Sequence, residues 1–385
     1  MPWQKRSPMD LRRQFIRDYL TDAFTMTELC ATYQISRKTG YKMLGRFDAA
    51  GWPGLADRSR RPVTAACRVP PAIIEALCAA RRQKPAWGAR KLRRWLRNRQ
   101  PRIAWPSRGT IHAVLIGAGL VRRARARVAS VPRGPNRLRV ATAANAVWTV
   151  DFKGDFRLGN GRHCYPLTLR DAASRYTLRC QALSQPDLTA TRRQIERAFA
   201  EFGLPECIRS DNGQPFAGLG LGHLSQLNVS WLRLGIAVEQ IVPGRPDQNG
   251  SHEQFHRVLK AQTTRPPADT LGGQQRRFDT FRREYNEERP HEALGDEVPA
   301  RHYRASPRPW PARPPALEYP SHWETRYVGS NGCVRLRHAR VFVSTALVDQ
   351  CIAFEEIDDG IWTVHFGRLA LARWLERERQ LQPLL

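Results

Sequence analysis

The sequence has no acidic residue between Glu75 and Asp151, although 18 lysines and arginines occur in that interval. It also lacks an apolar run long enough to cross a membrane, and no apolar segment typical of a secretory signal follows its N-terminus. We therefore expect a cytoplasmic protein without a membrane partner. None of the eight cysteines forms a Cys-x-x-Cys pair, which argues against a disulfide framework and a cysteine zinc site.

The basic charge is concentrated in the first third of the chain. Residues 1–145 hold 31 basic and 7 acidic side chains, whereas residues 146–385 hold 32 and 28. A solubilising surface normally interleaves both signs of charge, so cations without acidic neighbours predict a polyanionic partner. The formal charge of +28 thus indicates nucleic-acid binding.

The first helix-turn-helix domain is predicted within residues 1–60. Apolar residues recur at helical spacing over residues 26–46, on either side of a break near Gln34. Ser36 is a suitable N-cap for the second helix, whose exposed first turns would present Arg37, Lys38 and Lys42 to a major groove. A surface helix pair without a DNA role is the alternative.

A second helix-turn-helix domain is predicted over residues 68–122. Leu92, Trp95 and Leu96 would face its core, and Ser107 would cap its third helix. The basic side chains of this unit are expected to face outward, and its predicted DNA contacts are Arg90, Lys91, Arg94 and Arg108. Residues 123–145 form a basic linker.

An α/β layer fold is predicted from residue 146 onward. Three neighbouring antiparallel strands are expected first, followed by a helix over Leu188–Phe202 and a short strand over Glu206–Ser210. A further helix near residues 221–234 and a strand ending in AVEQIVP complete a mixed sheet flanked by helices.

Three carboxylates are candidates for one site. Asp151 ends a predicted strand, Asp211 follows another, and Glu253 lies early on a predicted helix. Carboxylates that converge repel one another, so such a cluster indicates bound divalent cations. Ligands that are all oxygen atoms favour Mg²⁺ or Mn²⁺ over zinc.

Five separated motifs between residues 147 and 303 resemble the integrase core of DDE insertion-sequence transposases, which are relatives of retroviral integrases. The motifs are WTVDFK, DAASRY, RSDNGQPF, GRPDQNGSHEQFHRVLK and YNEERPHEAL. The resemblance implies a ribonuclease-H-like core over residues 146–304, a catalytic and metal-binding triad of Asp151, Asp211 and Glu253, and a DNA contact at Lys260. The segment GLGLGHLSQLN between Asp211 and Glu253 is interpreted as a loop insertion.

Other residues compete for the roles in this site. Asp155, Asp171 and Asp247 are alternative carboxylates, of which Asp171 is expected to order a hairpin and Asp247 to cap a helix. The string HEQFH also matches the zinc peptidase signature, with His252 and His256 as ligands. Polar neighbours and a nearby proline argue against that peptidase, and His256 is expected to lie near DNA.

The C-terminal part is predicted to be an all-β domain. A proline-rich linker over residues 305–320 precedes short β runs over residues 321–385, interpreted as a small antiparallel barrel similar to the SH3-like tail of integrases. Its basic and acidic residues balance, so assembly and DNA contact are both plausible roles.

The sequence as a whole predicts a multidomain DNA transposase that binds double-stranded DNA at the terminal repeats of its element and in the target. Two Mg²⁺ or Mn²⁺ ions per active site would support strand cleavage and strand transfer. At least a dimer is expected on DNA, associated with the bacterial nucleoid. The alternatives are a DNA-binding regulator with an inactive core and a nonspecific ribonuclease H.

Overall fold

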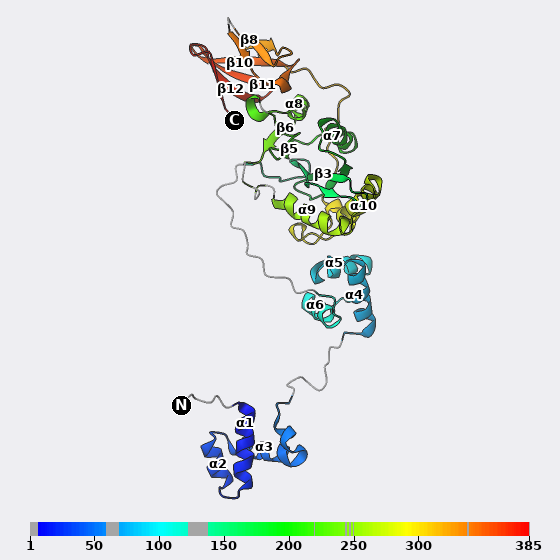
Figure 1. The fold of residues 1–385 in the computed structure, drawn as a ribbon, viewed down its shortest axis with the longest axis vertical. Helices are drawn as coiled ribbons and strands as arrows, with labels where there is room; N and C mark the ends of the chain where they lie inside the picture. Colours follow the sequence, from blue (N-terminus) through cyan, green and yellow to red (C-terminus); the bar gives the residue numbers. More distant parts are fainter. Residues whose placement is uncertain are drawn as a thin grey trace. The chain divides into compact units, whose positions relative to one another are not determined.

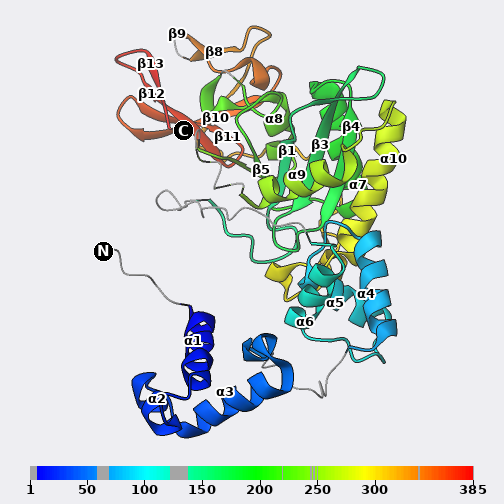
Figure 2. The same cartoon turned by 60° about the horizontal axis from the view of Figure 1, so that its bottom comes forward.

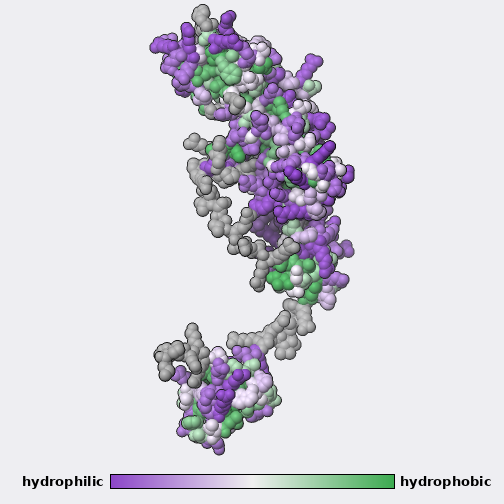
Figure 3. All heavy atoms as spheres, in the orientation of Figure 1, coloured by the Kyte–Doolittle hydropathy of each residue, from purple (hydrophilic) through white to green (hydrophobic). Residues whose placement is uncertain are grey.

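The computed structural model describes residues 7–58, 69–121, 138–218, 220–242, 245, 248, 250–336 and 339–384. The chain forms two compact units, Met1–Pro70 and Pro71–Leu385 (Figure 1). The second predicted helix-turn-helix domain therefore belongs to the same unit as the core. No helix in the described ranges is long and apolar enough to cross a bilayer. Hydrophilic side chains cover much of the face of the core that is visible in Figure 3.

The first unit consists of three α-helices and a 3₁₀ turn. These elements are α1 (Pro8–Leu20), α2 (Met26–Thr32), α3 (Arg37–Ala50) and η1 (Trp52–Leu55). Ser36 caps α3 as predicted, since its side chain accepts a hydrogen bond from the Thr39 N–H. Helices α2 and α3 approach so closely at Gly40 that a β-carbon there would lie 2.6 Å from Sγ of Cys30. A side chain at position 40 would therefore push α2 and α3 apart.

The second helical domain also has three helices. They are α4 (Pro71–Gln83), α5 (Ala89–Arg99) and α6 (Arg108–Gly117). Trp87 and Trp95 meet edge to face in its core, and Leu92 is fully buried beside them. The predicted inward face of α5 and the predicted Ser107 cap are both confirmed.

A mixed six-stranded sheet forms the centre of the core. Its strands are β1 (Trp148–Phe152), β2 (Phe156–Arg157), β3 (His163–Asp171), β4 (Thr177–Leu183), β5 (Cys207–Ser210) and β6 (Ala237–Gln240). The order is β2-β3-β1-β5-β6, with β4 also paired to β3. Strands β1, β3 and β4 are antiparallel neighbours as predicted, whereas β5 and β6 run parallel to β1.

Helices cover both faces of this sheet. They are α7 (Leu188–Phe202), α8 (Gln226–Arg233), α9 (Gly250–Thr263) and α10 (Leu271–Arg283), followed by the short turns η4 (Glu284–Glu288), η5 (Glu292–Leu294) and η6 (Pro299–Arg301). Val150, Leu167 and Leu169 pack in one apolar cluster with residues of α7 and α8. Residues alternate along a strand, so Asp151 and Thr168 point to the opposite face, where α9 lies (Figure 2).

The C-terminal domain is all-β, but the small antiparallel barrel predicted for residues 321–385 is not confirmed, because the sheets of the described residues are not closed. Its elements are β7 (Glu324–Tyr327), β8 (Cys333–Leu336), β9 (Ala339–Phe342), η7 (Thr345–Leu347), β10 (Cys351–Asp358), β11 (Ile361–Phe366), β12 (Leu369–Leu375) and β13 (Gln380–Pro383). An open sheet of order β13-β12-β11-β10-β7 stands beside the β8–β9 hairpin. Its apolar face is covered partly by Leu224 and Val229 of the core, so closure is not needed to bury it.

The segment GLGLGHLSQLN, which was predicted to be a loop insertion, helps to cover the apolar face of the C-terminal sheet. Leu221 N–H donates to the Val343 carbonyl at 3.1 Å, and a β-carbon at Gly220 would lie 2.3 Å from Oγ of Ser344. The segment contains the 3₁₀ turn η2 (Leu221–His223) and leads into α8. It is therefore a structured contact between the core and the C-terminal domain.

Candidate active site

The parallel pairing of β1 and β5 brings Asp151 and Asp211 to the same edge of the sheet. Thr149 is paired with Arg209, so the two aspartates, each two residues further on, are in register. Side chains alternate along a strand, so each aspartate points to the same face as the paired residue two positions before it. Asp151 and Asp211 therefore lie on the same face of the sheet. Only 16% of the Asp151 side chain is exposed, and Asp211 is half-buried.

Glu253 lies on α9, the helix that packs against the face of the sheet to which Asp151 points. It lies in the first turn of that helix, where the helix dipole favours a negative charge, and its side chain is exposed. Burial, reinforced by the charges of Asp211 and Glu253, raises the pKa of Asp151 to about 7, and nearby Lys153 lowers it only in part. The charges of Asp211 and Glu253, the other two members of the predicted triad, thus act on Asp151.

The pKa of Asp211 is also raised, mainly because the carboxyl group is partly buried. The Gly213 N–H donates to its Oδ1 at 3.3 Å and opposes this increase. Two carboxyl groups with raised pKa values at one sheet edge form an electrostatically unfavourable arrangement. Divalent cations would relieve it.

The competing acids have other roles or lie elsewhere. Asp171 accepts hydrogen bonds from the N–H groups of Asn145 and Ser174 at 2.7 Å each, so it orders the hairpin as predicted. Asp155 is exposed and pairs with His163. Asp247 lies outside the described residues.

His256, which was expected to lie near DNA, has a buried side chain that is only 4% exposed. His252 is fully buried next to it, and both Nε2 atoms lie 2.7 Å from Oγ1 of Thr168. Burial lowers the pKa of His256 to about 3 and that of His252 well below its ordinary value. Both rings are therefore neutral at physiological pH.

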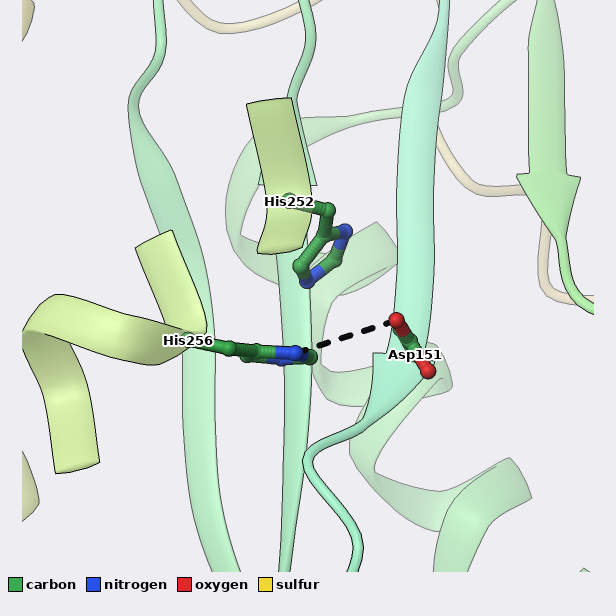
Figure 4. A group of neighbouring side chains, drawn as sticks. All are labelled: Asp151, His252 and His256. Carbon is green, nitrogen blue, oxygen red and sulfur yellow. Dashed lines mark ion pairs between the residues drawn. The ribbon is translucent and has the colours of Figure 1, made fainter. Parts of the chain in front are cut away.

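Figure 4 shows His252 and His256 beside the Asp151 carboxylate, with Nδ1 of His256 3.8 Å from Oδ2 of Asp151. One candidate ligand atom from each of these three residues lies within 4.8 Å of the other two. In a zinc peptidase Glu253 would act as the general base beside the two histidine ligands. Here Glu253 is exposed, whereas both histidines are buried. This arrangement does not favour a zinc peptidase.

Thr168 and Arg170 hold α9 in place, and neither was expected to belong to the site. The guanidinium of Arg170 is buried 4.3 Å above the Phe255 ring and donates to the Ser251 carbonyl at 3.1 Å. The first turn of α9, which carries Glu253, is thereby fixed against β3. The polar residues Thr168 and Arg170 alternate with leucines in the strand sequence PLTLRD. This alternation was the sequence signal from which their place on the α9 face of the sheet could have been predicted.

The predicted DNA contacts differ in their surroundings. Among them, Arg37, Lys38, Lys42, Arg108 and Lys260 have exposed side chains. Arg90 and Arg94 instead form ion pairs with carboxylates of the core, so the prediction that they face outward is wrong. Arg90 contacts Glu292 and Asp296, and Arg94 contacts Glu297.

Two further lysines of the second helical domain also face the core. Nζ of Lys84 lies 2.9 Å from a carboxylate oxygen of both Glu284 and Glu288, and its side chain is only 9% exposed. The pKa of Lys91 falls to about 8, chiefly through burial and secondly through the charge of Arg289. The α5 side of this domain is therefore a docking surface.

Comparison with known families identifies the parts of the chain. Residues 141–246 and 234–299 each match an integrase core domain. Residues 11–62 match a helix-turn-helix domain, and residues 39–115 match a homeodomain-like domain. The chain thus carries helix-turn-helix matches in its first third, followed by integrase core matches.

Curated relatives include proteins of insertion elements and retroviruses. The integrase-core chain is 28% identical over 184 residues to an uncharacterized 31.7 kDa protein of insertion element IS407 from Burkholderia multivorans, covering 48% of this chain and 64% of that protein. It is 28% identical to an uncharacterized 39.2 kDa protein of IS476 from Xanthomonas euvesicatoria, over 43% and 46% of the two chains. The chain thus spans less than two thirds of either relative. Among solved structures, the HTLV-2 integrase catalytic core with magnesium is 14% identical at a TM-score of 0.34, covering 43% of this chain and all of that one.

Proposed function

We propose that this protein is a DNA transposase that cleaves the ends of its mobile element and joins them to target DNA. The observation that carries the proposal is the carboxylate cluster of Asp151, Asp211 and Glu253 within an integrase core domain. No nucleophilic side chain is required, because the attacking groups are water and then a DNA 3′-hydroxyl. The intact triad disfavours a regulator with an inactive core.

Two phosphoryl transfers make up the proposed reaction. In the first, water attacks a phosphodiester at the element end, the bond to the 3′-oxygen breaks, and a free 3′-hydroxyl is left. In the second, that hydroxyl attacks a target phosphodiester and releases a target 3′-hydroxyl, so one phosphodiester replaces another. The half-buried setting of Asp151 and Asp211 excludes part of the bulk water and strengthens their electrostatic effect.

Divalent cations fit the donor set of this site. Asp151, Asp211 and Glu253 offer hard oxygen ligands, and the raised pKa of Asp151, which is due mainly to burial, would fall on binding a cation. We propose two Mg²⁺ or Mn²⁺ ions, held between these carboxylates. When bound, such ions stabilise the attacking and leaving oxygens of an in-line displacement.

The exposed first turns of α3 are the proposed reader of the element's terminal repeats. Arg37, Lys38 and Lys42 lie there without an ion pair to any described residue. Lys260 is exposed on α9, the helix that carries Glu253, and is proposed to contact DNA at the active site. Because an element has two ends, at least a dimer is proposed for paired-end transfer, acting at the bacterial nucleoid.

The test is a cleavage assay on duplexes that carry the two ends of the encoding element. Asp151→Asn, Asp211→Asn and Glu253→Gln should each abolish nicking and strand transfer while leaving end binding intact, because a carboxamide keeps the shape but loses the charge. Asp155→Asn is the matched control, since Asp155 is exposed and pairs with His163 outside the triad. Nicking by a triad variant at the wild-type rate would remove that residue from the site.

A further inference from the structure

Thr168 contacts both neighbouring histidines through one oxygen. Its hydroxyl lies 3.1 Å from the Asp151 carbonyl, to which it can donate its one hydrogen. The two histidine Nε2 atoms lie 2.7 Å from the same oxygen, which can accept from both rings in that arrangement. In this arrangement Nε2 carries the proton and Nδ1 keeps a free lone pair in His252 and His256.

The Nδ1 atoms of the two rings lie on the side away from Thr168. Nδ1 of His256 lies 3.8 Å from Oδ2 of Asp151, beyond hydrogen-bond distance. Nδ1 of the fully buried His252 has no hydrogen-bond partner among the described residues. A buried acceptor without a partner costs free energy, so this arrangement calls for a bound cation.

The geometry also supplies what a metal site requires beyond its ligands. A histidine that binds a metal through one nitrogen usually donates its other N–H to an oxygen that fixes the ring, and Thr168 does this for both rings. Two ligand atoms 3.8 Å apart suit one ion bound to each at about 2.1 Å. The rings lie on the aspartate side of α9, as Figure 4 shows.

We propose that Asp151, His252 and His256 bind one transition-metal ion of the Mn²⁺ or Zn²⁺ class through two ring nitrogens and a carboxylate oxygen. Imidazole ligands favour Zn²⁺, and Mn²⁺ accepts nitrogen beside oxygen ligands, whereas Mg²⁺ prefers oxygen ligands alone. The site shares Asp151 with the carboxylate triad, so its place in the reaction rests on the proposed function. Binding of the ion itself does not depend on that function.

The test is pulsed electron paramagnetic resonance on the full chain loaded with Mn²⁺ alone. Directly bound imidazole nitrogen should produce ¹⁴N modulation of the electron spin echo in the wild type. His252→Gln and His256→Gln should each weaken this modulation, and the double variant should lose it. His163→Gln is the matched control, since it removes a histidine near a different carboxylate, and it should leave the spectrum unchanged.

Thr168→Val keeps both rings but removes their common acceptor. It should retain the ¹⁴N modulation while weakening Mn²⁺ affinity by about 10–100-fold in a calorimetric titration, the usual effect of losing such a partner. If histidine variants fail to fold, the wild-type spectrum still decides. Bound Mn²⁺ without ¹⁴N modulation, or no Mn²⁺ binding at all, would overturn the site.

Asp211→Asn separates this proposal from the transposase function. It should abolish nicking yet keep the ¹⁴N modulation, because Asp211 is not a ligand of the nitrogen site. A wild-type protein that shows the modulation but does not nick end DNA would contradict the function and leave the metal site standing. Nicking without the modulation would contradict the metal site alone.

Discussion

The acids around Asp151 and the ion pairs around Lys84 are both charged clusters of the second unit, arranged in opposite ways. Asp151 lies near two further carboxylates, and its pKa rises to about 7. Lys84 lies between Glu284 and Glu288, with a contact of 2.9 Å to each. Matched charges hold domains together, whereas like charges that remain close destabilise the protein unless a ligand neutralises them. The contrast distinguishes a docking surface from a binding site.

The strongest test of this contrast removes the strained charge. Asp151→Asn should stabilise the metal-free protein near pH 8 by about 2–4 kcal/mol, because a folded-state pKa near 7 lies well above the ordinary value of 3.8. The stabilisation should shrink as pH falls through 7 towards 4, since the wild-type carboxyl then becomes protonated. Chemical denaturation in the presence of a chelator measures it.

Asp279→Asn is the control for that experiment. Asp279 is exposed on α10 and accepts a hydrogen bond from Gln275, which an asparagine oxygen can also accept. Its substitution should change the free energy of unfolding little at either pH. A destabilising effect of Asp151→Asn near pH 8 would show that the carboxylate cluster is not under electrostatic strain.

The matched cluster should respond in the opposite direction. Lys84→Met should lower the free energy of unfolding of the second unit by about 1–3 kcal/mol, because it leaves Glu284 and Glu288 adjacent without their cation. Lys260→Met removes an exposed lysine and should change stability by less than about 0.5 kcal/mol. Equal effects of the two substitutions would contradict a docking role for Lys84.

The cations of α3 extend the comparison to the first unit. Replacing Arg37, Lys38 and Lys42 together by glutamine should change stability least, yet weaken DNA binding most. The slope of log affinity against log salt should fall by about 2.7 if each cation neutralises one phosphate. Fluorescence anisotropy on end DNA over a salt series measures this slope.

Three exposed arginines of the C-terminal domain serve as the matched control. Replacing Arg335, Arg340 and Arg373 by glutamine removes the same charge from another surface. That variant should keep the wild-type salt slope. An equal loss of slope in both triple variants would mean that overall charge, not α3, directs binding.

Local signals in the sequence predicted the elements that position the site. Ser36 and Ser107 predicted two helix starts, and the helix over Leu188–Phe202 was predicted at its observed bounds. The order of motifs predicted the three carboxylates, and the charges of Asp211 and Glu253 contribute to the raised pKa of Asp151. These features depend on neighbouring residues or on one local motif.

Features that depend on distant contacts were not predictable in this way. Arg90 pairs with Asp296, some two hundred residues further along the sequence. Helical periodicity indicates that Arg90 faces away from the core of its own domain, but it cannot indicate which distant residue Arg90 contacts. His256 lies on a helix, and its burial could not be predicted because its partner Thr168 lies on strand β3, 88 residues away in sequence. Likewise, Leu224 and Val229 cover the C-terminal sheet from within the core, so strand patterning alone could not show that this sheet stays open.

The most direct test of the central claim is strand cleavage by the full chain on duplexes carrying the ends of its encoding element, with Mg²⁺ or Mn²⁺ supplied. The wild type should produce a nick with a free 3′-hydroxyl and then join that end to a target plasmid. Asp151→Asn should bind the same duplex and do neither. End binding without metal-dependent nicking by the wild type, or nicking that survives the Asp151→Asn substitution, would contradict the transposase assignment.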